Sequence, residues 1–189
     1  MSDPAGMVVD INAADAPSAC AVLLHPHPDY GGDRFHPLID QLFARLPGRS
    51  VSAIRFDFST SAPGAARDDV IAAMDVGTQH WPQLPVVVAG YSFGAGIAAT
   101  VDDQRIAGWL LVAPPSAMLA QATIGGDSRP KMVVVPEDDQ YSPPEAVAQV
   151  IRGWASTSMS TLAGADHFLG PVEPVVEHAV SWIRSLVSP

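Results

Sequence analysis

Positive charge and cysteine are scarce in this chain of 189 residues. Ten Lys and Arg residues stand against twenty Asp and Glu residues, which gives a formal net charge of −10. Such a surface repels nucleic acid phosphates and anionic lipid headgroups, so we expect neither nucleic acid nor membrane as a partner. Cys20 is the only cysteine. No disulfide can therefore form within the chain, which fits a reducing compartment.

Long hydrophobic runs are also missing. The longest apolar runs, such as 19–24 and 86–89, are far shorter than the roughly 20 residues that a helix needs to cross a bilayer. The first residues, Met-Ser-Asp-Pro, lack the basic start and the apolar stretch of a secretory signal. We therefore expect a cytoplasmic protein.

Short apolar runs alternate with amphipathic stretches, which is the pattern of βαβ units. Runs that are apolar throughout predict strands buried on both faces of a parallel sheet, and apolar residues at helical spacing predict the helices between them. The predicted strands are 8–12, 19–24, 51–58, 85–89, 106–112, 131–135 and 156–162. The predicted helices are 36–46, 67–76, 95–101, 142–151 and 175–187. This order predicts one α/β domain over 1–189, with a mostly parallel central sheet flanked by helices.

Two helix ends and one connection carry further predictions. Gly77 follows the helix predicted at 67–76 and is expected to end it. Ser142 precedes two prolines and stands three residues before Glu145, which predicts a capping serine at the start of the next helix. The stretch 116–130 shows no clear pattern and is too short to form a large lid domain.

One glycine-rich pentapeptide carries the main chemical signal. Gly-Tyr-Ser-Phe-Gly at 90–94 matches G-x-S-x-G, the nucleophile elbow. It follows an apolar strand and precedes a helix of small residues, which is the context that the motif requires. The glycines leave room for a strained turn, and the helix points its positive end at the place where an oxyanion forms. The spacing predicts Ser92 as a nucleophile.

A serine hydroxyl needs a base before it can act as a nucleophile, and His167 is the candidate. It lies just after the last predicted strand, where a loop can reach the same edge of the sheet. We interpret three other histidines, at a helix start, in a connection and inside a helix, as surface residues: His36, His80 and His178.

The acid that orients the histidine should lie between Ser92 and His167, after a strand. Three adjacent acids follow the strand predicted at 131–135, namely Glu137, Asp138 and Asp139. The order serine, acid, histidine is satisfied by any of them. The other interpretation is that they form only a solvated acidic loop.

An oxyanion hole needs two backbone amides. One should belong to Phe93, directly after the nucleophile. The other should come from the loop that follows the first buried strand. Pro26 and Pro28 have no amide hydrogen, which leaves His25 and His27 at the tight start of this loop. We favour His27.

Metal and cofactor signals are weak. His25 and His27 form a possible ligand pair, but no cysteine or further histidine clusters with them in the sequence. The chain has no glycine-rich dinucleotide motif and no phosphate-binding loop. We therefore expect neither a metal nor an organic cofactor.

Apolar and aromatic residues near these loops are candidates for binding a substrate. They are Tyr30, Met118, Tyr141 and Phe168, with Phe93 and Leu119 beside them. A short lid region leaves little apolar wall for a long acyl tail. We therefore expect a small or short-chain acyl substrate.

Four stretches together point to a known group of proteins: 24–32 (Leu-His-Pro-His-Pro-Asp-Tyr-Gly-Gly), 55–58, 90–94 and 111–115. Across about 19–167 the chain resembles small bacterial α/β-hydrolases related to dienelactone hydrolase. The resemblance implies a mostly parallel sheet flanked by helices, with little or no lid. It also implies a catalytic triad of Ser92, Asp139 and His167.

The chain departs from this family at two positions. Dienelactone hydrolases use a cysteine nucleophile, and this chain has Ser92, so we do not expect that activity. The glycine that precedes the family's acidic motif is Pro136 here, and Asp138 therefore stays an alternative to Asp139.

These features predict a serine hydrolase of the carboxylesterase or thioesterase type, acting by two-step acyl transfer on a small-molecule acyl ester. Two alternatives stay open. One is a non-catalytic binding protein that has kept the fold. The other is a peptidase or acyltransferase with the same triad.

Overall fold

The computed structural model describes residues 7–187. Within these residues, seven strands form one sheet in the order β1-β3-β2-β4-β5-β6-β7. β1 pairs antiparallel with β3, and the other neighbouring pairs are parallel, so the predicted mostly parallel sheet is confirmed. The strands are β1 (Val9–Asn12), β2 (Ala19–Leu24), β3 (Val51–Phe56), β4 (Val86–Tyr91), β5 (Ile106–Val112), β6 (Lys131–Asp138) and β7 (Thr157–Asp166).

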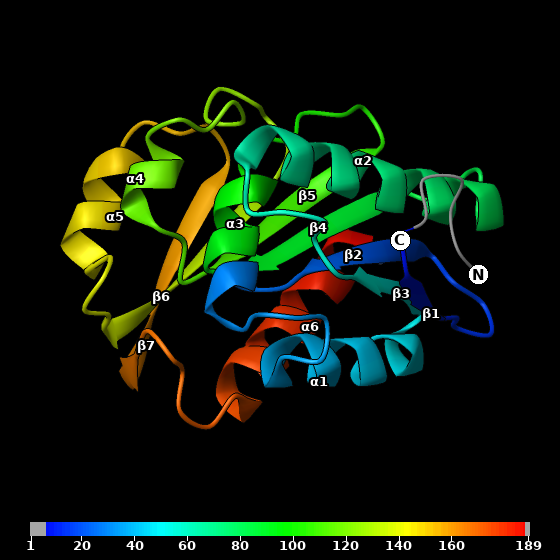
Figure 1. Cartoon of the computed structure of the whole chain (residues 1–189), viewed down its shortest axis with the longest axis horizontal. Coiled ribbons are helices and arrows are strands. Elements are labelled where there is room, and N and C mark those ends of the chain that lie inside the picture. Colours follow the sequence, from blue (N-terminus) through cyan, green and yellow to red (C-terminus); the bar gives the residue numbers. More distant parts are fainter. Residues whose placement is uncertain (1–6, 188–189) are drawn as a thin grey trace.

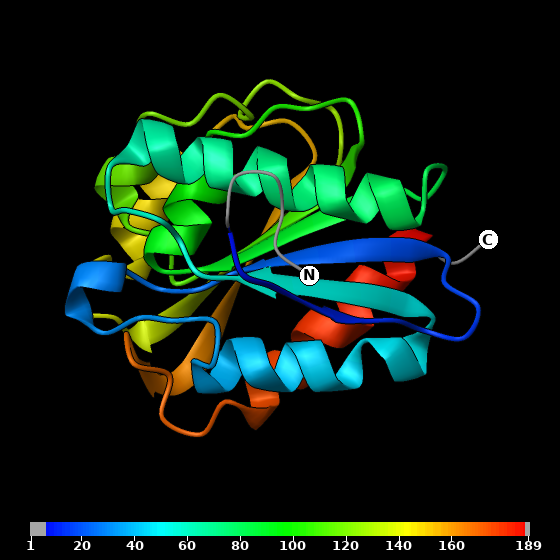
Figure 2. The same ribbon diagram turned by 45° about the vertical axis from the view of Figure 1, so that its right-hand side comes forward.

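Helices cover both faces of the sheet (Figure 1). α1 and α6 pack against one face, and α2 to α5 pack against the other. Figure 2 shows the sheet between these two layers. The α-helices are α1 (Pro37–Arg45), α2 (Pro63–His80), α3 (Phe93–Ala98), α4 (Ser116–Leu119), α5 (Pro144–Val150) and α6 (Glu173–Val187). Two short 3-10 helices are η1 (Pro28–Tyr30) and η2 (Pro47–Arg49).

The central strands are apolar throughout because both of their faces are covered. Every residue of β2 and of β4 is buried. Side chains of a strand alternate between the two faces of its sheet. In β2, Val22 and Leu24 belong to the core under α2 and α3, whereas Ala21 and Leu23 belong to the core under α1 and α6.

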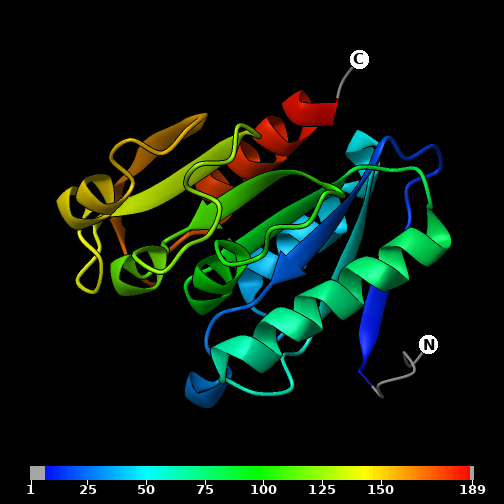
Figure 3. The same cartoon turned by 90° about the horizontal axis from the view of Figure 1, so that it is seen from above.

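The parallel topology gathers the loops that carry chemistry. In such a sheet, the loops after the carboxyl ends of the strands meet at one edge. Ser92 follows β4, Asp139 follows β6 and His167 follows β7. Figure 3 shows the twisted sheet from above, with β1 and β7 at opposite sides. The loop after β2, which contains η1, reaches the same edge near the middle of the sheet.

The prediction that Gly77 ends a helix is wrong. α2 runs from Pro63 to His80, so Gly77 lies inside it. A Cβ at Gly77 would lie 3.2 Å from Cys20 Sγ and 3.2 Å from Ile54 Cδ1. The glycine lets the helix pack closely on β2 and β3. In the sequence alone, a glycine that ends a helix looks the same as a glycine that allows such close packing.

The prediction of a capping serine is also wrong. α5 begins at Pro144, with Pro143 as its N-cap residue, and has no side-chain cap. The Ser142 hydroxyl instead accepts a hydrogen bond from the Ser116 amide at 2.9 Å, across to α4. The local pattern indicated a helix start, but the Ser142 side chain bonds to the first residue of α4 instead of capping α5.

The remaining differences concern element lengths. β3 ends at Phe56, two residues before the predicted end, while β6 and β7 continue to Asp138 and Asp166. α3 starts directly after the elbow, at Phe93. Among residues 7–187, no helix is both long enough and apolar enough to cross a membrane.

Candidate active site

The turn between β4 and α3 holds Ser92 in a strained conformation. Its φ is 51° and its ψ is −115°, which places a non-glycine residue at positive φ. A Cβ at Gly90 would lie 2.4 Å from the backbone of Gly94. A Cβ at Gly94 would lie 2.5 Å from the Leu24 carbonyl oxygen. Both glycines of the pentapeptide are therefore required, one by the turn itself and one by the neighbouring end of β2.

His167 lies beside this serine. Its Nε2 atom is 3.0 Å from Ser92 Oγ, within hydrogen-bond distance. The histidine follows β7 and is buried, with its ring edge-to-face against the exposed ring of Tyr141. Ser92 and His167 are 75 positions apart in the sequence, and the parallel order of β4, β5, β6 and β7 brings them together.

Asp139 lies on the far side of the imidazole. Its Oδ2 atom is 2.8 Å from His167 Nδ1, and its side chain is fully buried. Its Oδ1 atom accepts hydrogen bonds from the amides of Tyr141 at 2.9 Å and Ser142 at 2.8 Å. These amides fix one oxygen of the carboxylate, so the other oxygen faces the histidine.

The neighbouring acids lie elsewhere. Asp138 and Glu137 are exposed at the end of β6. Glu137 accepts a hydrogen bond from the Gly164 amide at 2.9 Å, which ties β6 to the segment before His167. The structure therefore brings Asp139, of the three adjacent acids, to the histidine.

Two residues that the sequence analysis did not identify hold the backbone of His167. The Tyr91 hydroxyl donates a hydrogen bond to the His167 carbonyl at 2.7 Å, and burial raises the pKa of Tyr91 well above its usual value. The Gln140 side-chain oxygen accepts from the His167 amide at 3.3 Å. Tyr91 is a variable position of the pentapeptide, so the motif alone does not reveal this contact.

The loop after β2 lies against the elbow, and the His27 ring lies 4.8 Å from the ring of Phe93 in a tilted arrangement. Within residues 7–187, neither the His27 amide nor the Phe93 amide has a hydrogen-bond acceptor. Phe93 is the first residue of α3, so its amide belongs to the positive end of that helix. The two amides predicted for an oxyanion hole are therefore both open.

His25 fixes the start of this loop. Its Nδ1 is 2.6 Å from the Pro26 carbonyl oxygen, and its Nε2 accepts from the Phe58 amide at 2.9 Å. Since Nε2 accepts, Nδ1 carries the hydrogen and donates to Pro26. Burial lowers the pKa of His25, which favours this neutral form. Both ring nitrogens are thus engaged, and the described residues contain no group of three or more possible metal ligands.

Three of the four predicted substrate-binding residues lie exposed around the site. Tyr141 and Phe168 are 65% and 61% exposed, with rings 4.9 Å and 5.8 Å from that of His167. Tyr30 is 87% exposed and lies 4.8 Å from the His27 ring. Met118 is half-buried and packs from α4 against Gly96 of α3.

The remaining candidates have structural contacts. Phe93 is buried between His27 and Phe58. Leu119 is buried in the core. Cys20 is buried in β2, and burial raises the pKa of its thiol to about 12, so the thiolate does not form at neutral pH.

Known structures share this architecture over nearly the whole chain. A protein of unknown function from Agrobacterium tumefaciens is 24% identical, with a TM-score of 0.87 over 97% of this chain and 93% of that one. A lidless α/β serine hydrolase from Xanthomonas campestris is 16% identical, with a TM-score of 0.87 over 100% and 94%. An α/β serine hydrolase homologue from Coxiella burnetii is 24% identical, with a TM-score of 0.81 over 100% and 95%.

The chain has the α/β-hydrolase fold. At these identities the likeness is one of fold. No protein-family model and no curated protein matches the sequence.

The connection between β5 and β6 bears on access to Ser92 in this α/β-hydrolase fold. The stretch between β5 and β6 contains the four-residue helix α4, in agreement with the lidless neighbour.

His36, interpreted from sequence as a surface residue, is half-buried, and its ring lies 4.8 Å from that of Tyr91. His80 and His178 are exposed, as predicted.

Proposed function

We propose that this protein is a serine hydrolase that cleaves small acyl esters or thioesters by two-step acyl transfer. The observation that carries the proposal is the continuous line of contacts from Ser92 through His167 to Asp139, at 3.0 Å and 2.8 Å. Strained backbone at the serine adds to it, because such strain collects at functional sites. The fold it shares with serine hydrolases from Coxiella burnetii and Xanthomonas campestris agrees with this class of reaction.

The hydrogen-bond pattern supports one tautomer for the reaction. Asp139 Oδ1 is engaged by two amides, so Oδ2 accepts from Nδ1–H of His167. Nε2 is then a lone-pair acceptor and takes the proton of Ser92 as its oxygen attacks the acyl carbonyl. Asp139 stabilises the imidazolium that results. His167 next protonates the leaving alcohol or thiol, and water releases the acid from Ser92 by the same steps.

Negative charge develops on the carbonyl oxygen during both steps. The open amides of Phe93 and His27 are the donors that we assign to this oxygen. Such preorganised donors stabilise the charge more effectively than water does, because they need no reorientation.

Exposed aromatic rings suit a small substrate with a flat or short acyl group. Tyr141 and Phe168 stand on the histidine side of Ser92, and Tyr30 stands on the side of His27. They offer apolar contact at an open surface instead of a long channel. We therefore assign Tyr30, Tyr141 and Phe168 to substrate contact and expect short acyl chains to react best.

Nitrophenyl esters of increasing acyl length test both the reaction and the substrate size. We expect the highest kcat/KM for acetate and butyrate esters and a decline for long chains. Ser92→Ala should remove this turnover, while its thermal unfolding stays close to that of the wild type. A preference for long chains would contradict the substrate size alone, whereas full turnover by Ser92→Ala would contradict the mechanism.

A further inference from the structure

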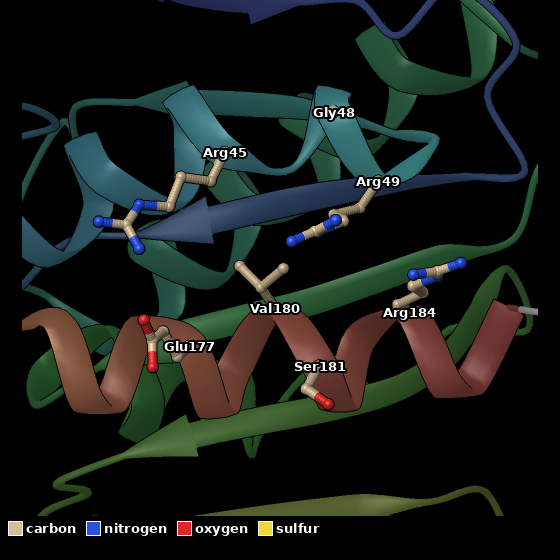
Figure 4. A pocket seen from close by; sticks show the side chains of 7 residues that line it. All are labelled: Arg45, Gly48, Arg49, Glu177, Val180, Ser181 and Arg184. Atoms are coloured by element: carbon tan, nitrogen blue, oxygen red, sulfur yellow. The ribbon is translucent and has the colours of Figure 1, made fainter.

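A pocket between α1 and α6 is lined by three arginines (Figure 4). Its volume is about 470 Å³, and its lining residues are Arg45, Gly48, Arg49, Glu177, Val180, Ser181 and Arg184. Arg45 and Arg184 belong to the last turns of α1 and α6, and Arg49 ends η2. The lining therefore holds three cationic side chains and one carboxylate, in a protein whose formal net charge is −10.

Four arginines outside this pocket each pair with two aspartates: Arg34, Arg55, Arg105 and Arg129. Two others outside it, Arg67 and Arg152, form no ion pair within the described part of the chain. Among residues 7–187, neither Arg45 nor Arg49 forms an ion pair, although Glu177 lines the same pocket. Arg45 and Arg49 thus line the pocket without a direct ion-pair partner among these residues, and Glu173 is a charged neighbour of Arg45.

Val180 is the one apolar side chain that lines the pocket, and most of the other lining side chains are charged. Figure 4 shows the Arg49 guanidinium between η2 and α6, above Val180. Arg184 lies toward one end of the pocket, and Arg45 and Glu177 lie toward the other. Guanidinium groups present planar forks of N–H donors that match the oxygens of phosphates and carboxylates.

Helix ends explain only part of this arrangement. A cation in the last turn of a helix interacts favourably with the partial negative charge there. This accounts for Arg45 and Arg184 but not for Arg49, which lies outside both α-helices. It also does not require the three side chains to line one pocket.

We propose that this pocket binds a small, multiply charged oxyanion, with two or more phosphate or carboxylate groups. Several guanidiniums at different points of one pocket suit a ligand with more than one anionic group. The net negative charge of the protein repels anions in general, so a local basic cluster is needed to retain one. α1 and α6 run back from the edge that carries Ser92, so the pocket lies toward the opposite end of the sheet and this ligand is separate from the acyl substrate.

Calorimetric titration with pyrophosphate and with citrate tests the proposal, with acetate at matched ionic strength as the monovalent control. We expect one saturable site for at least one of the two multivalent anions and none for acetate. Arg49→Glu should weaken that binding by about tenfold or more, the effect of losing a charge-assisted contact. Arg152→Glu makes the same charge change at an exposed residue outside the pocket and should alter the affinity by less than about twofold.

A second variant keeps every charge in place. No atom lies within 4 Å of the position that a Cβ at Gly48 would take, so Gly48→Leu is accommodated and adds an apolar side chain at a residue that lines the pocket. It should also weaken binding by about tenfold. The proposal fails if neither multivalent anion saturates the wild type, if Arg49→Glu and Arg152→Glu weaken binding equally, or if Gly48→Leu binds as the wild type does.

Discussion

The two sides of Ser92 are built differently. On the histidine side, the polar groups of Asp139 and His167 are held by neighbours: two amides and the imidazole engage the carboxylate, and Tyr91 and Gln140 hold the histidine backbone. On the side of the β2 loop, the amides of His27 and Phe93 have no acceptor among the described residues. The hydrogen bonds of this loop, such as those from the Tyr30 and Gly32 amides to the His27 carbonyl oxygen, leave the His27 and Phe93 amides open.

This difference matches the two parts of the proposed reaction, proton transfer on one side and oxyanion stabilisation on the other. A proton relay works when its groups are oriented before substrate arrives, so their hydrogen bonds are made within the protein. An oxyanion hole works when its donors are oriented but still available. The loop achieves this by anchoring itself through His25 at its start and through Arg34, which pairs with Asp57, near its end.

The largest effect is expected from breaking the orientation of the histidine. Asp139→Asn keeps the shape of the side chain but removes the charge that selects the productive tautomer. We expect kcat for a nitrophenyl ester to fall by about 100- to 10,000-fold, with little change in KM. Asp138→Asn is the matched control and should keep kcat within about twofold, since Asp138 is exposed at the end of β6. If the two variants lose activity equally, the assignment of Asp139 is wrong.

A smaller loss is expected from loosening the other side. His25→Phe removes the hydrogen bonds to Pro26 and Phe58 that anchor the β2 loop. The His27 amide then moves relative to Ser92, and we expect kcat to fall by about 10- to 100-fold. The exposed His80 provides the control, and His80→Phe should behave as the wild type. Unchanged kcat in a folded His25→Phe protein would show that the loop does not depend on this anchor.

The aromatic rings should affect selectivity more than turnover. Tyr141→Leu and Phe168→Leu should each lower kcat/KM for phenylacetate-type acyl groups by less than about tenfold, and for acetyl esters by less still. Phe35→Leu is the control, because Phe35 is also an exposed aromatic residue. Its ring lies against Arg34, in the loop before α1, and against Arg55 of β3. If Phe35→Leu and Tyr141→Leu lower kcat/KM equally for both ester types, Tyr141 does not contact the substrate as proposed.

Two histidines shielded from water, the buried His25 and the half-buried His36, predict a modest effect of pH on stability. Burial lowers the pKa of His25 and of His36, so the unfolded chain binds protons that the folded chain excludes. The free energy of unfolding should therefore fall as pH drops below about 6.5, and level off once the folded residues protonate. His36→Asn keeps a side-chain acceptor at the start of α1 and should make the decline shallower, whereas His178→Gln, at an exposed position, should not. Urea unfolding across this pH range measures both slopes.

The sequence predicted the sheet well because its signals are local. Continuous apolar runs mark β2 and β5 to the residue, and the elbow was evident from a serine between two glycines after a strand. The choice among three adjacent acids was not local. It depends on how β6 ends and on the two amides that hold Asp139, and neither is visible in the order of the residues.

Other features escaped prediction for the same reason. Gly77 and Ser142 carry local helix-end signals, but their actual roles are contacts with β2 and with α4. The arginine pocket joins residues about 135 positions apart, from η2 and from α6, so no spacing rule reveals it. Local rules thus predict elements, whereas sites depend on which elements become neighbours.

The most direct test of the central claim is labelling with a fluorophosphonate probe, read by intact mass on the wild type and on Ser92→Ala. Such probes react with serines whose hydroxyl is activated by a base. The account predicts a single adduct on the wild type, no adduct on Ser92→Ala, and much slower labelling of Asp139→Asn. A folded wild-type protein that forms no adduct, or a Ser92→Ala protein that is labelled equally well, would contradict it.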